Sequence, residues 1–509
     1  MLATVASATL VGVEGRPIEV EVHVSRGLPS FTVVGLPDAS CREARDRVRA
    51  AILSSGLAWP QHRVTVNLAP SGLRKGGAGL DLPIAVALLA ADGQLGTDRI
   101  SGMGFLGELG LDGSIRRVGG VLPLVDAIRS GKVVVPASCA AEAALVRPGD
   151  VHAAGSLGEL VSVLKGERNW PATAELPAGE EPRTGPDMSD VRGQPMGRLA
   201  AEVAAAGGHH VLFVGPPGAG KTMLAERIPG LLPSLSTDEA LEVSRVHSAA
   251  GLALPSGVLV RRPPYRAPHQ SSSLVSLIGG GGTLMRPGEL SCAHRGVLFL
   301  DELGEFASDV LDTLRQPLEE GKVMVCRARA SVVFPARVLL VAAMNPCPCG
   351  GDGGPGSCRC SEASLARYAA RVSGPLLDRF DLRVRVDRPD VSDLLGAPDR
   401  AGAAHESSDA IRGRVLAARA AARGRGVASN ALIAATDLDR IAPLHPPARR
   451  LLESRLRQGQ LSARGAHRVR RVARTLADLS GRGGEIDEEH LAAALSLRSN
   501  LFTAERVLA

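Results

Sequence analysis

The stretch that decides the fold is "HHVLFVGPPGAGKTMLAERIPGLL", residues 209–232. An apolar run ends at Val214, the segment "GPPGAGKT" (215–222) follows, and a helical pattern begins directly after it. This is the pattern G-x-x-x-x-G-K-[ST], in the strand–loop–helix setting that gives it meaning. Glycine-rich loops at a helix N-terminus let backbone N–H groups surround a phosphate. The stretch therefore predicts an α/β nucleotide-binding domain that holds ATP.

Each part of this loop has an expected role. Lys221 is expected to reach the β- and γ-phosphates, and Thr222 to ligate Mg²⁺. The cofactors predicted here are therefore ATP and Mg²⁺. The predicted nucleotide-binding residues are Gly215, Pro216, Pro217, Gly218, Ala219, Gly220, Lys221 and Thr222.

A second apolar run, "VLFLDE" (297–302), places two acids at the end of a strand. Asp301 is expected to hold the water shell of Mg²⁺, and Glu302 to polarise the attacking water. Adjacent acids at a strand end are common, but together with the phosphate loop they predict ATP hydrolysis. A third run, "RVLLVAAMN" (337–345), is also continuously apolar, which is typical of a parallel sheet covered on both faces.

The 509 residues are too many for a single core, so several domains are expected. Residues 1–168 alternate strand-like runs with helical ones and predict a compact α/β domain. The ATPase core is expected to follow a linker rich in proline, glycine and acidic residues, and to precede a set of C-terminal helices. The predicted boundaries are 1–168 for the first domain, 169–187 for the linker, 188–387 for the core, 388–405 for a second linker and 406–509 for the helices.

The charge of the chain favours anionic partners. The net charge is +6 and the isoelectric point is about 9.1. Arginines are concentrated in the C-terminal third, and only 2% of residues are aromatic. With few rings to stack on bases, nucleic-acid binding is expected to run through phosphates and to be salt-sensitive. The alternative is that these arginines reflect a GC-rich genome and cover solvated helix faces.

Nothing in the sequence predicts a membrane segment. The apolar run "LPIAVALLAA" (82–91) is too short to span a bilayer. The N-terminus lacks the basic region of a secretion signal. We therefore expect a cytoplasmic protein without a membrane partner, in which cysteines are reduced and bind metal more readily than they pair.

Several motifs together resemble those of AAA+ ATPases of the group that contains magnesium-chelatase subunits and MCM helicases. These motifs are "DVRGQ" (190–194), "LDEL" (300–303), "AAMNPCPCG" (342–350) and "SGPLLDRFDL" (373–382). Over essentially the whole chain, the sequence is similar to the YifB/ComM family of magnesium-chelatase-like proteins. The resemblance implies a central AAA+ domain of the helix-2-insert type and a C-terminal helical lid.

The same resemblance implies further site residues. Asn345 matches the sensor-1 residue that positions water, and Arg379 matches an arginine finger that reaches the γ-phosphate of a neighbouring subunit. Such a finger implies a ring, and hence a homo-hexamer. The alternative for Arg379 is an ion pair with Asp378 or Asp381. Arg464 matches the sensor-2 arginine, with Arg468, one helical turn further, as second candidate.

Two insertions also match this group. Residues 261–291 correspond to a helix-2 insert, and residues 321–338 form two β-rich runs that resemble the pre-sensor-1 hairpin. In hexameric relatives these elements face the central pore. Arg327 and Arg329, at the turn of the hairpin, are therefore predicted to contact DNA phosphates. Alternatively, they only solvate the turn.

Two stretches, "VNLAPSGLRKGGAGLDLPIAVALLAA" (66–91) and "LGELGLDGSIRRVGGVLPLVDAI" (106–128), resemble the proteolytic domain of Lon and the related domain of RadA. The resemblance implies a fold of the ribosomal S5 domain 2 type. Lon uses a Ser–Lys dyad. In our alignment, Gly79 occupies the serine position and Leu122 the lysine position, so the fold is expected without the peptidase chemistry. Ser71 and Lys75 lie nearby but outside the aligned positions.

Four of the eight cysteines lie in "NPCPCGGDGGPGSCRC" (345–360). Two C-x-C pairs on a Gly/Pro-rich loop can supply four thiolates at about 2.3 Å from a zinc ion. Three interpretations remain open for Cys347, Cys349, Cys358 and Cys360: a structural zinc site, reduced free thiols, or a redox or iron–sulfur role. The other four, Cys41, Cys139, Cys292 and Cys326, are expected to be buried apolar residues.

The leading functional hypothesis is an ATP-driven motor on branched or single-stranded DNA. Similarity to the YifB/ComM family implies branch migration in recombination and natural transformation. One alternative is an ATPase that assists metal insertion into a porphyrin, although the Lon/RadA-like domain is not expected in chelatase subunits. A protein-remodelling ATPase is the other alternative, and the loss of the dyad argues against a protease.

Overall fold

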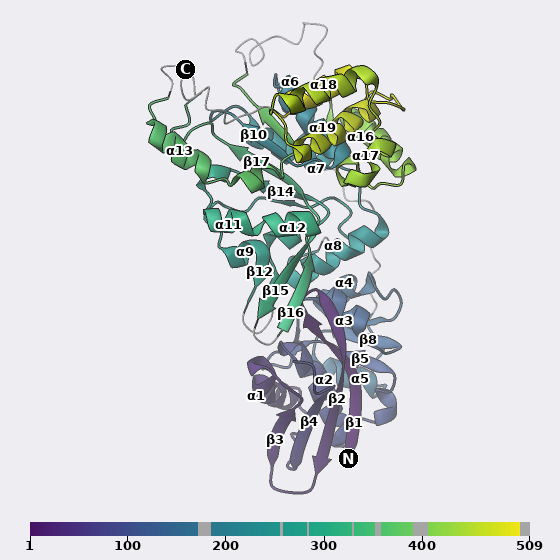
Figure 1. Ribbon diagram of the computed structural model, residues 1–509. Helices are drawn as coiled ribbons and strands as arrows, with labels where there is room; N and C mark the ends of the chain where they lie inside the picture. The colour runs from purple at the N-terminus through teal and green to yellow at the C-terminus, as the bar shows by residue number, and fades with distance from the viewer. Residues whose placement is uncertain are drawn as a thin grey trace.

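The computed structural model describes residues 1–171, 185–254, 258–281, 285–327, 330–351, 358–389 and 406–498. An N-terminal α/β region lies at one end of the molecule, a region built on a parallel sheet lies in the middle, and a helical region lies at the other end (Figure 1). Most of each predicted linker falls outside the described residues. The predicted α/β class with a parallel-sheet core is confirmed.

The N-terminal region is a seven-stranded mixed sheet in the order β3-β4-β2-β1-β5-β8-β9. Long strands β1 and β2 pair antiparallel in register Leu2↔His23 through Val11↔Glu14. Helix α2 is buried along its whole length and fills the core beneath the sheet. The bounds are β1 Leu2–Val11, β2 Glu14–Ser25, β3 Ser30–Val34, α1 Ala39–Ser54, β4 Arg63–Ala69, α2 Asp81–Ala91, β5 Met103–Phe105, β6 Glu108–Leu109, β7 Ile115–Arg116, α3 Val121–Ala127, β8 Lys132–Pro136, α4 Ala140–Ala144, β9 Val151–Ala154 and α5 Leu157–Leu164. The alternation of strands and helices predicted for residues 1–168 is observed, and the Lon-like assignment stays a prediction.

The central sheet has five strands in the order β11-β14-β17-β10-β18, and all four neighbouring pairs are parallel. Strands β10, β14 and β17 are buried at every position, as their apolar runs predict. Because they are parallel, their carboxyl ends meet at one edge of the sheet. The strand bounds are β10 Val211–Val214, β11 Tyr265–Arg266, β14 Val297–Leu300, β17 Leu339–Met344 and β18 Leu382–Arg385.

Helices and smaller strands surround this sheet. A separate antiparallel hairpin, β15 (Lys322–Arg327) and β16 (Ala330–Pro335), matches the hairpin predicted from the sequence. The other elements are α6 Pro195–Gly207, α7 Lys221–Leu231, α8 Thr237–Ala250, α9 Leu274–Ile278, β12 Gly279–Gly280, β13 Arg286–Pro287, α10 Glu289–Cys292, α11 Ser308–Thr313, α12 Arg315–Glu320, α13 Glu362–Ala370 and α14 Gly374–Leu377.

The C-terminal helices share a core with the central region. One apolar cluster includes Ala204 of α6, Phe213 of β10, Val415 of α16 and Val469 of α19. The C-terminal helices therefore pack against α6 and the central sheet. Their bounds are α16 Ser408–Gly424, α17 Leu438–Ile441, α18 Pro446–Arg457, α19 Ala463–Leu479 and α20 Glu488–Ser496. None of the helices within the described ranges combines the length and apolar character needed to cross a bilayer.

The hairpin extends from the central region and lies against the N-terminal region (Figure 1). A Cβ on Gly12, in the turn between β1 and β2, would lie 2.1 Å from Cγ1 of Val332 on β16. The flanking Val11 and Val13 pack on the same apolar cluster as Val332 and Phe334. Glycine at this turn, with φ of +67°, therefore permits the close approach of the two regions.

Candidate active site

The phosphate loop runs from the end of β10 into the first turn of α7. Gly215 is required there, because a Cβ would lie 1.9 Å from the carbonyl oxygen of Val386 on the neighbouring chain segment. Gly220 has φ of +88° and caps α7, a conformation that glycine adopts without steric cost. The loop is therefore shaped by its glycines, as the motif requires.

Lys221 is buried and folds back over the loop. Its Nζ donates to the carbonyl oxygens of Gly215 at 2.6 Å and Pro216 at 2.9 Å, and to Oδ1 of Asn345 at 3.0 Å. Burial lowers the pKa of Lys221, although the nearby charges of Asp301 and Glu302 oppose that effect. The ammonium is thus held by neutral oxygens, which are weaker partners than phosphate.

The two acids lie at the carboxyl end of β14, as predicted. Thr222 Oγ1 donates to Oδ2 of Asp301 at 2.9 Å, so the two groups predicted to hold Mg²⁺ are in direct contact. Glu302 follows with φ of +51°, a conformation rare for residues other than glycine. Its backbone N–H donates to Oδ1 of Asp301 at 2.9 Å, and its side chain is exposed. Hydroxyl and carboxylate oxygens are suitable ligands for Mg²⁺.

Asn345 lies directly after β17 and joins this group through its contact with Lys221. Gln194, which the sequence did not single out as a site residue, is hydrogen-bonded to the phosphate loop. Its Nε2 donates to the carbonyl oxygen of Ala219 at 2.9 Å and also to that of Asp387. The signal for Gln194 was its place in "DVRGQ", just before α6.

Arg379 does not form the alternative ion pair considered above. Its guanidinium pairs with Glu319 of α12, and its side chain is 12% exposed while that of Glu319 is 59% exposed. Asp378 pairs instead with Arg383, at 3.3 Å. The alternative in which Arg379 binds Asp378 or Asp381 is therefore wrong for the described chain.

Of the two sensor-2 candidates, Arg468 is the one beside Arg379. Its Nη1 donates to the carbonyl oxygen of Arg379 at 3.1 Å and to Oδ1 of Asp381 at 2.5 Å. Arg464 is exposed in the first turn of α19. Within the described residues, neither arginine forms a hydrogen bond or ion pair with the phosphate loop, and a role at the nucleotide stays a prediction.

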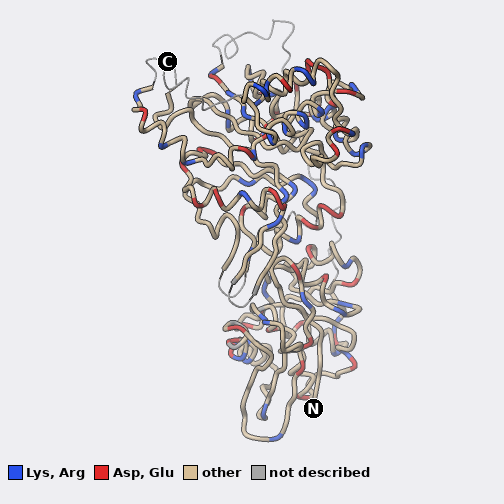
Figure 2. The backbone as a smooth tube through the Cα atoms, in the orientation of Figure 1, with Lys and Arg blue, Asp and Glu red and all other residues tan. Residues whose placement is uncertain are grey.

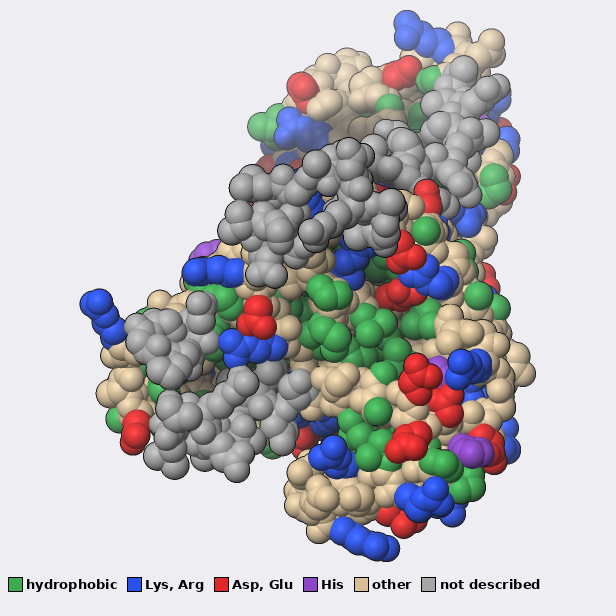
Figure 3. Space-filling model, turned by 90° about the horizontal axis from the view of Figure 1, so that it is seen from above, with side chains coloured by type: hydrophobic (Ala, Val, Ile, Leu, Met, Phe, Trp, Pro, Cys, Tyr) green, Lys and Arg blue, Asp and Glu red, His purple; other side chains and the backbone are tan. Residues whose placement is uncertain are grey.

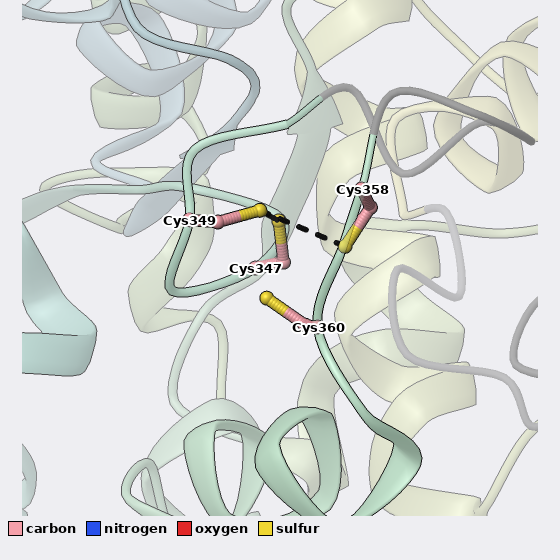
Figure 4. A group of neighbouring side chains, drawn as sticks. All are labelled: Cys347, Cys349, Cys358 and Cys360. Atoms are coloured by element: carbon pink, nitrogen blue, oxygen red, sulfur yellow. Dashed lines mark hydrogen bonds between the residues drawn. The ribbon is translucent and has the colours of Figure 1, made fainter.

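The four cysteines of the 345–360 loop lie together. All four Sγ atoms are within 4.8 Å of one another. They come from two segments of the loop and point toward a common centre (Figure 4). The cluster is compatible with a zinc ion. Among the other cysteines, Cys41, Cys139 and Cys292 are buried as expected, but Cys326 is exposed on the hairpin, so the expectation for Cys326 is wrong.

The predicted DNA contacts are only partly described. Arg327 ends β15, and nothing can be said of its side chain, while Arg329 lies outside the described residues. Many arginines of the C-terminal helices bind groups of the same chain: Arg414 pairs with Glu202 and Glu406, Arg425 and Arg474 with Asp478, Arg470 with Asp439, and Arg419 donates to the carbonyl oxygen of Ala205.

Charges are mixed along the chain and on the face seen from above, where basic and acidic side chains are interspersed (Figures 2 and 3). Several arginines of the C-terminal third therefore form ion pairs within the chain, while others, such as Arg423, Arg449 and Arg464, are exposed. The argument for DNA binding from the arginine-rich composition is weakened.

The positions aligned with a peptidase dyad carry no catalytic group. A Cβ on Gly79 would lie 3.3 Å from Leu106 Cδ1, within an apolar environment. Leu122 is fully buried, and its N–H donates to Oγ of Ser248 on α8 at 3.3 Å. Ser248 Oγ in turn donates to Oε1 of Glu142 at 2.5 Å. The start of α3 therefore serves as a contact with the central region.

Together, the glycine-shaped phosphate loop, the Thr222–Asp301 pair and the parallel sheet define a P-loop ATPase of the magnesium-chelatase type. Family profiles described as "Magnesium chelatase, subunit ChlI", "Subunit ChlI of Mg-chelatase" and "Magnesium chelatase, subunit ChlI C-terminal" match residues 187–394, 20–138 and 405–498. Over 98% of its length the chain is 41–42% identical to proteins named YifB and ComM, and it therefore belongs to the YifB/ComM family of magnesium-chelatase-like proteins.

Relatives similar over almost their whole length support this assignment. An uncharacterized protein of Mycobacterium tuberculosis is 46% identical over 97% of this chain and 97% of its own length. Competence protein ComM of Haemophilus influenzae and the uncharacterized protein YifB of Escherichia coli are each 42% identical over 98% of this chain and 97% of their own lengths. Family membership points to ATP and Mg²⁺ as the nucleotide and the metal.

Proposed function

We propose that this protein is an ATP-hydrolysing, ring-shaped DNA motor that promotes branch migration during recombination and natural transformation. The observation that carries the proposal is the similarity to a competence protein, at 42% identity across 98% of this chain. That similarity includes the N-terminal region as well as the ATPase core.

The side chains around the phosphate loop would carry out ATP hydrolysis. Phosphate oxygens would replace the carbonyl oxygens that now accept from Lys221 Nζ. Thr222 Oγ1 and the Asp301 carboxylate would hold Mg²⁺, which, when bound, neutralises charge on the β- and γ-phosphates. Glu302, exposed at the end of β14, would accept a proton from the attacking water as that water bonds to the γ-phosphorus. The Asn345 amide would orient the water, and ADP and phosphate would leave.

The ring is proposed to complete each site. Arg379 would exchange Glu319 for the γ-phosphate of the neighbouring subunit, which is a stronger anion. Arg468, bonded to the backbone of Arg379, would hold that segment in place. A homo-hexamer is the assembly implied by the family resemblance.

DNA contact is proposed for the β15–β16 hairpin. The hairpin is a separate two-stranded element, and in the sequence Arg327 ends its first strand and Arg329 directly precedes its second. Several C-terminal arginines are bound to carboxylates of the same chain. The hairpin is therefore a better candidate than the C-terminal helices for binding DNA phosphates. Binding of this kind depends on salt and is largely independent of sequence.

A second candidate is an ATPase that assists metal insertion into a porphyrin. The observation that favours it is that all three matching profiles carry a chelatase subunit's name, and one of them matches residues 20–138. The presence of the N-terminal domain therefore does not exclude this candidate. Protein remodelling is a third candidate.

The deciding experiment measures ATP turnover of the full chain with four additions: a four-way DNA junction, linear duplex DNA, a chelatase partner subunit with porphyrin, or unfolded polypeptide. The motor hypothesis predicts the largest stimulation by the junction, together with ATP-dependent strand exchange that Lys221→Ala abolishes. Stimulation by the porphyrin-loaded partner or by polypeptide, with none by the junction, would replace the proposal with the corresponding alternative.

A further inference from the structure

The loop that follows Asn345 brings four thiols to one point. Cys347 Sγ lies 3.3 Å from Cys349 Sγ, and Cys349 Sγ lies 3.7 Å from Cys358 Sγ. With Cys360, all four sulfur atoms fall within 4.8 Å of one another. Four thiolates around a tetrahedral zinc ion at about 2.3 Å would have sulfur atoms about 3.8 Å apart. The observed cluster is therefore close to the size of a zinc site.

Packing alone does not account for this arrangement. Only Cys347 is buried, whereas Cys349 is exposed and the other two are partly exposed. A thiol is a weak hydrogen-bonding group, so contacts among partly exposed thiols hold two loop segments together poorly. A bound ion would supply the missing cohesion, and four soft sulfur ligands in tetrahedral reach favour Zn²⁺ over Mg²⁺ or Ca²⁺.

The cluster is also in contact with the nucleotide site. A Cβ on Gly350, which has φ of +74°, would lie 2.9 Å from Cγ of Pro217 in the phosphate loop. Asn345, two residues before Cys347, accepts a hydrogen bond from Lys221. Helix α13 begins at Glu362, two residues after Cys360, and its Tyr368 is buried. The thiols thus sit where the phosphate loop, the end of β17 and α13 meet.

We propose that Cys347, Cys349, Cys358 and Cys360 bind one structural Zn²⁺ ion that fixes Asn345 and the Gly350–Pro217 contact in place for hydrolysis. The metal site itself is independent of the proposed DNA activity. Its effect on hydrolysis rests on the proposed ATPase function.

The first test is metal analysis of the full chain purified without chelators. About one zinc per chain is expected, with negligible iron and no visible absorption. Titration with an organomercurial should release that zinc as four thiols react, followed with a chromogenic zinc indicator. Cobalt substitution should give the intense sulfur-to-metal absorption of a four-thiolate site. Zinc well below one per chain that no added zinc restores, or iron in its place, would overturn the proposal.

Variants separate the site from the other cysteines. Cys349→Ser, at an exposed position, should lose the zinc because serine is a poor replacement for a thiolate. Cys326→Ser is the matched control, since Cys326 is exposed on β15 and distant in sequence from the cluster, and it should retain the zinc. Loss of zinc from the control together with Cys349→Ser, or retention in both, would contradict the assignment.

The consequence for hydrolysis is measured on the same variants. Because a small displacement of a positioning group is costly, Cys349→Ser should lower kcat about tenfold or more while changing ATP affinity much less. If zinc is lost but kcat is unchanged, the metal site stands and its link to Asn345 fails. If even the wild-type protein hydrolyses no ATP, the proposed function fails while the zinc result remains valid.

Discussion

Lys221 and Glu302 occupy different sides of the same site and should have separable roles. Lys221 is buried among oxygens of the phosphate loop and Asn345, and its ammonium donates hydrogen bonds to neutral oxygens there. Glu302 is exposed at the strand end and bonds Asp301 only through its backbone. The lysine is therefore placed to bind phosphate, and the glutamate carboxylate is left available for a water molecule.

Substitution of these two residues should separate ATP binding from ATP turnover. Lys221→Ala should abolish ATP binding, because the loop would lose its cation. Glu302→Gln should bind ATP with nearly unchanged affinity and lower kcat by about a hundredfold or more, since the amide cannot take the proton. Fluorescent-nucleotide titration and phosphate-release assays measure the two effects. Normal turnover by Glu302→Gln would remove Glu302 from the water-activating role.

At the scale of elements, a buried polar network joins the parallel sheet to the C-terminal helices. His209, just before β10, contacts Asp381 through Nδ1 at 3.3 Å and Thr475 Oγ1 of α19 through Nε2 at 2.8 Å. Asn430 Nδ2 donates to the same Thr475 oxygen at 3.2 Å and to Asp478 at 2.7 Å. Burial alone would raise the pKa of Asp381, but the hydrogen bond with His209 and the charge of Arg468 outweigh burial and lower it.

Thr475 lies at the centre of this network, so its hydroxyl should be needed for stability. Thr475→Val keeps the shape but leaves His209 and Asn430 without their shared oxygen. An unsatisfied buried polar group costs about 1–3 kcal/mol, so the melting temperature should fall clearly.

Thr436→Val, at an exposed position, is the matched control and should change stability by no more than about 0.5 kcal/mol. Differential scanning fluorimetry on both variants compares them directly. Equal melting temperatures for the two variants would mean that the hydrogen bonds of Thr475 do not contribute measurably to stability.

At the scale of the whole molecule, the ring hypothesis depends on what Arg379 does when chains assemble. Within one chain it pairs with Glu319, which is well exposed and can be released. If Arg379 acts at a neighbour, Arg379→Ala should bind ATP but hydrolyse it poorly. Glu319→Gln should hydrolyse at least as well as the wild type, since the competing carboxylate is gone.

Mixing tests the same point between chains. Neither Arg379→Ala nor Lys221→Ala should be active alone, but a mixture should recover part of the activity, because some interfaces would join an intact loop to an intact finger. Turnover measured over a series of mixing ratios should pass through a maximum. A flat series, together with loss of activity in Glu319→Gln, would identify the Arg379–Glu319 pair as a structural salt bridge.

Local sequence patterns predicted much of the central fold and of the candidate site. The continuous apolar runs at 211–214, 297–300 and 339–344 predict buried parallel strands because residues buried on both faces cannot alternate with polar ones. Parallel strands end at one edge of a sheet, which explains why Lys221, Asp301 and Asn345, each following one of these runs, lie in one site. The spacing of the four cysteines was likewise visible in the sequence, although three chemical interpretations were compatible with it.

Only the tertiary structure decided contacts between segments far apart in the chain. It paired Arg379 with Glu319, placed Gln194 on the phosphate loop, and set Gly350 against Pro217. It also showed that several arginines of the basic C-terminal third, among them Arg414, Arg425 and Arg474, are bound to carboxylates of the same chain. A guanidinium reaches whichever anion the fold brings near, and composition records the number of charges but not their neighbours. Sequence periodicity therefore determined the elements and their shared edge, while packing in three dimensions decided which side chains meet.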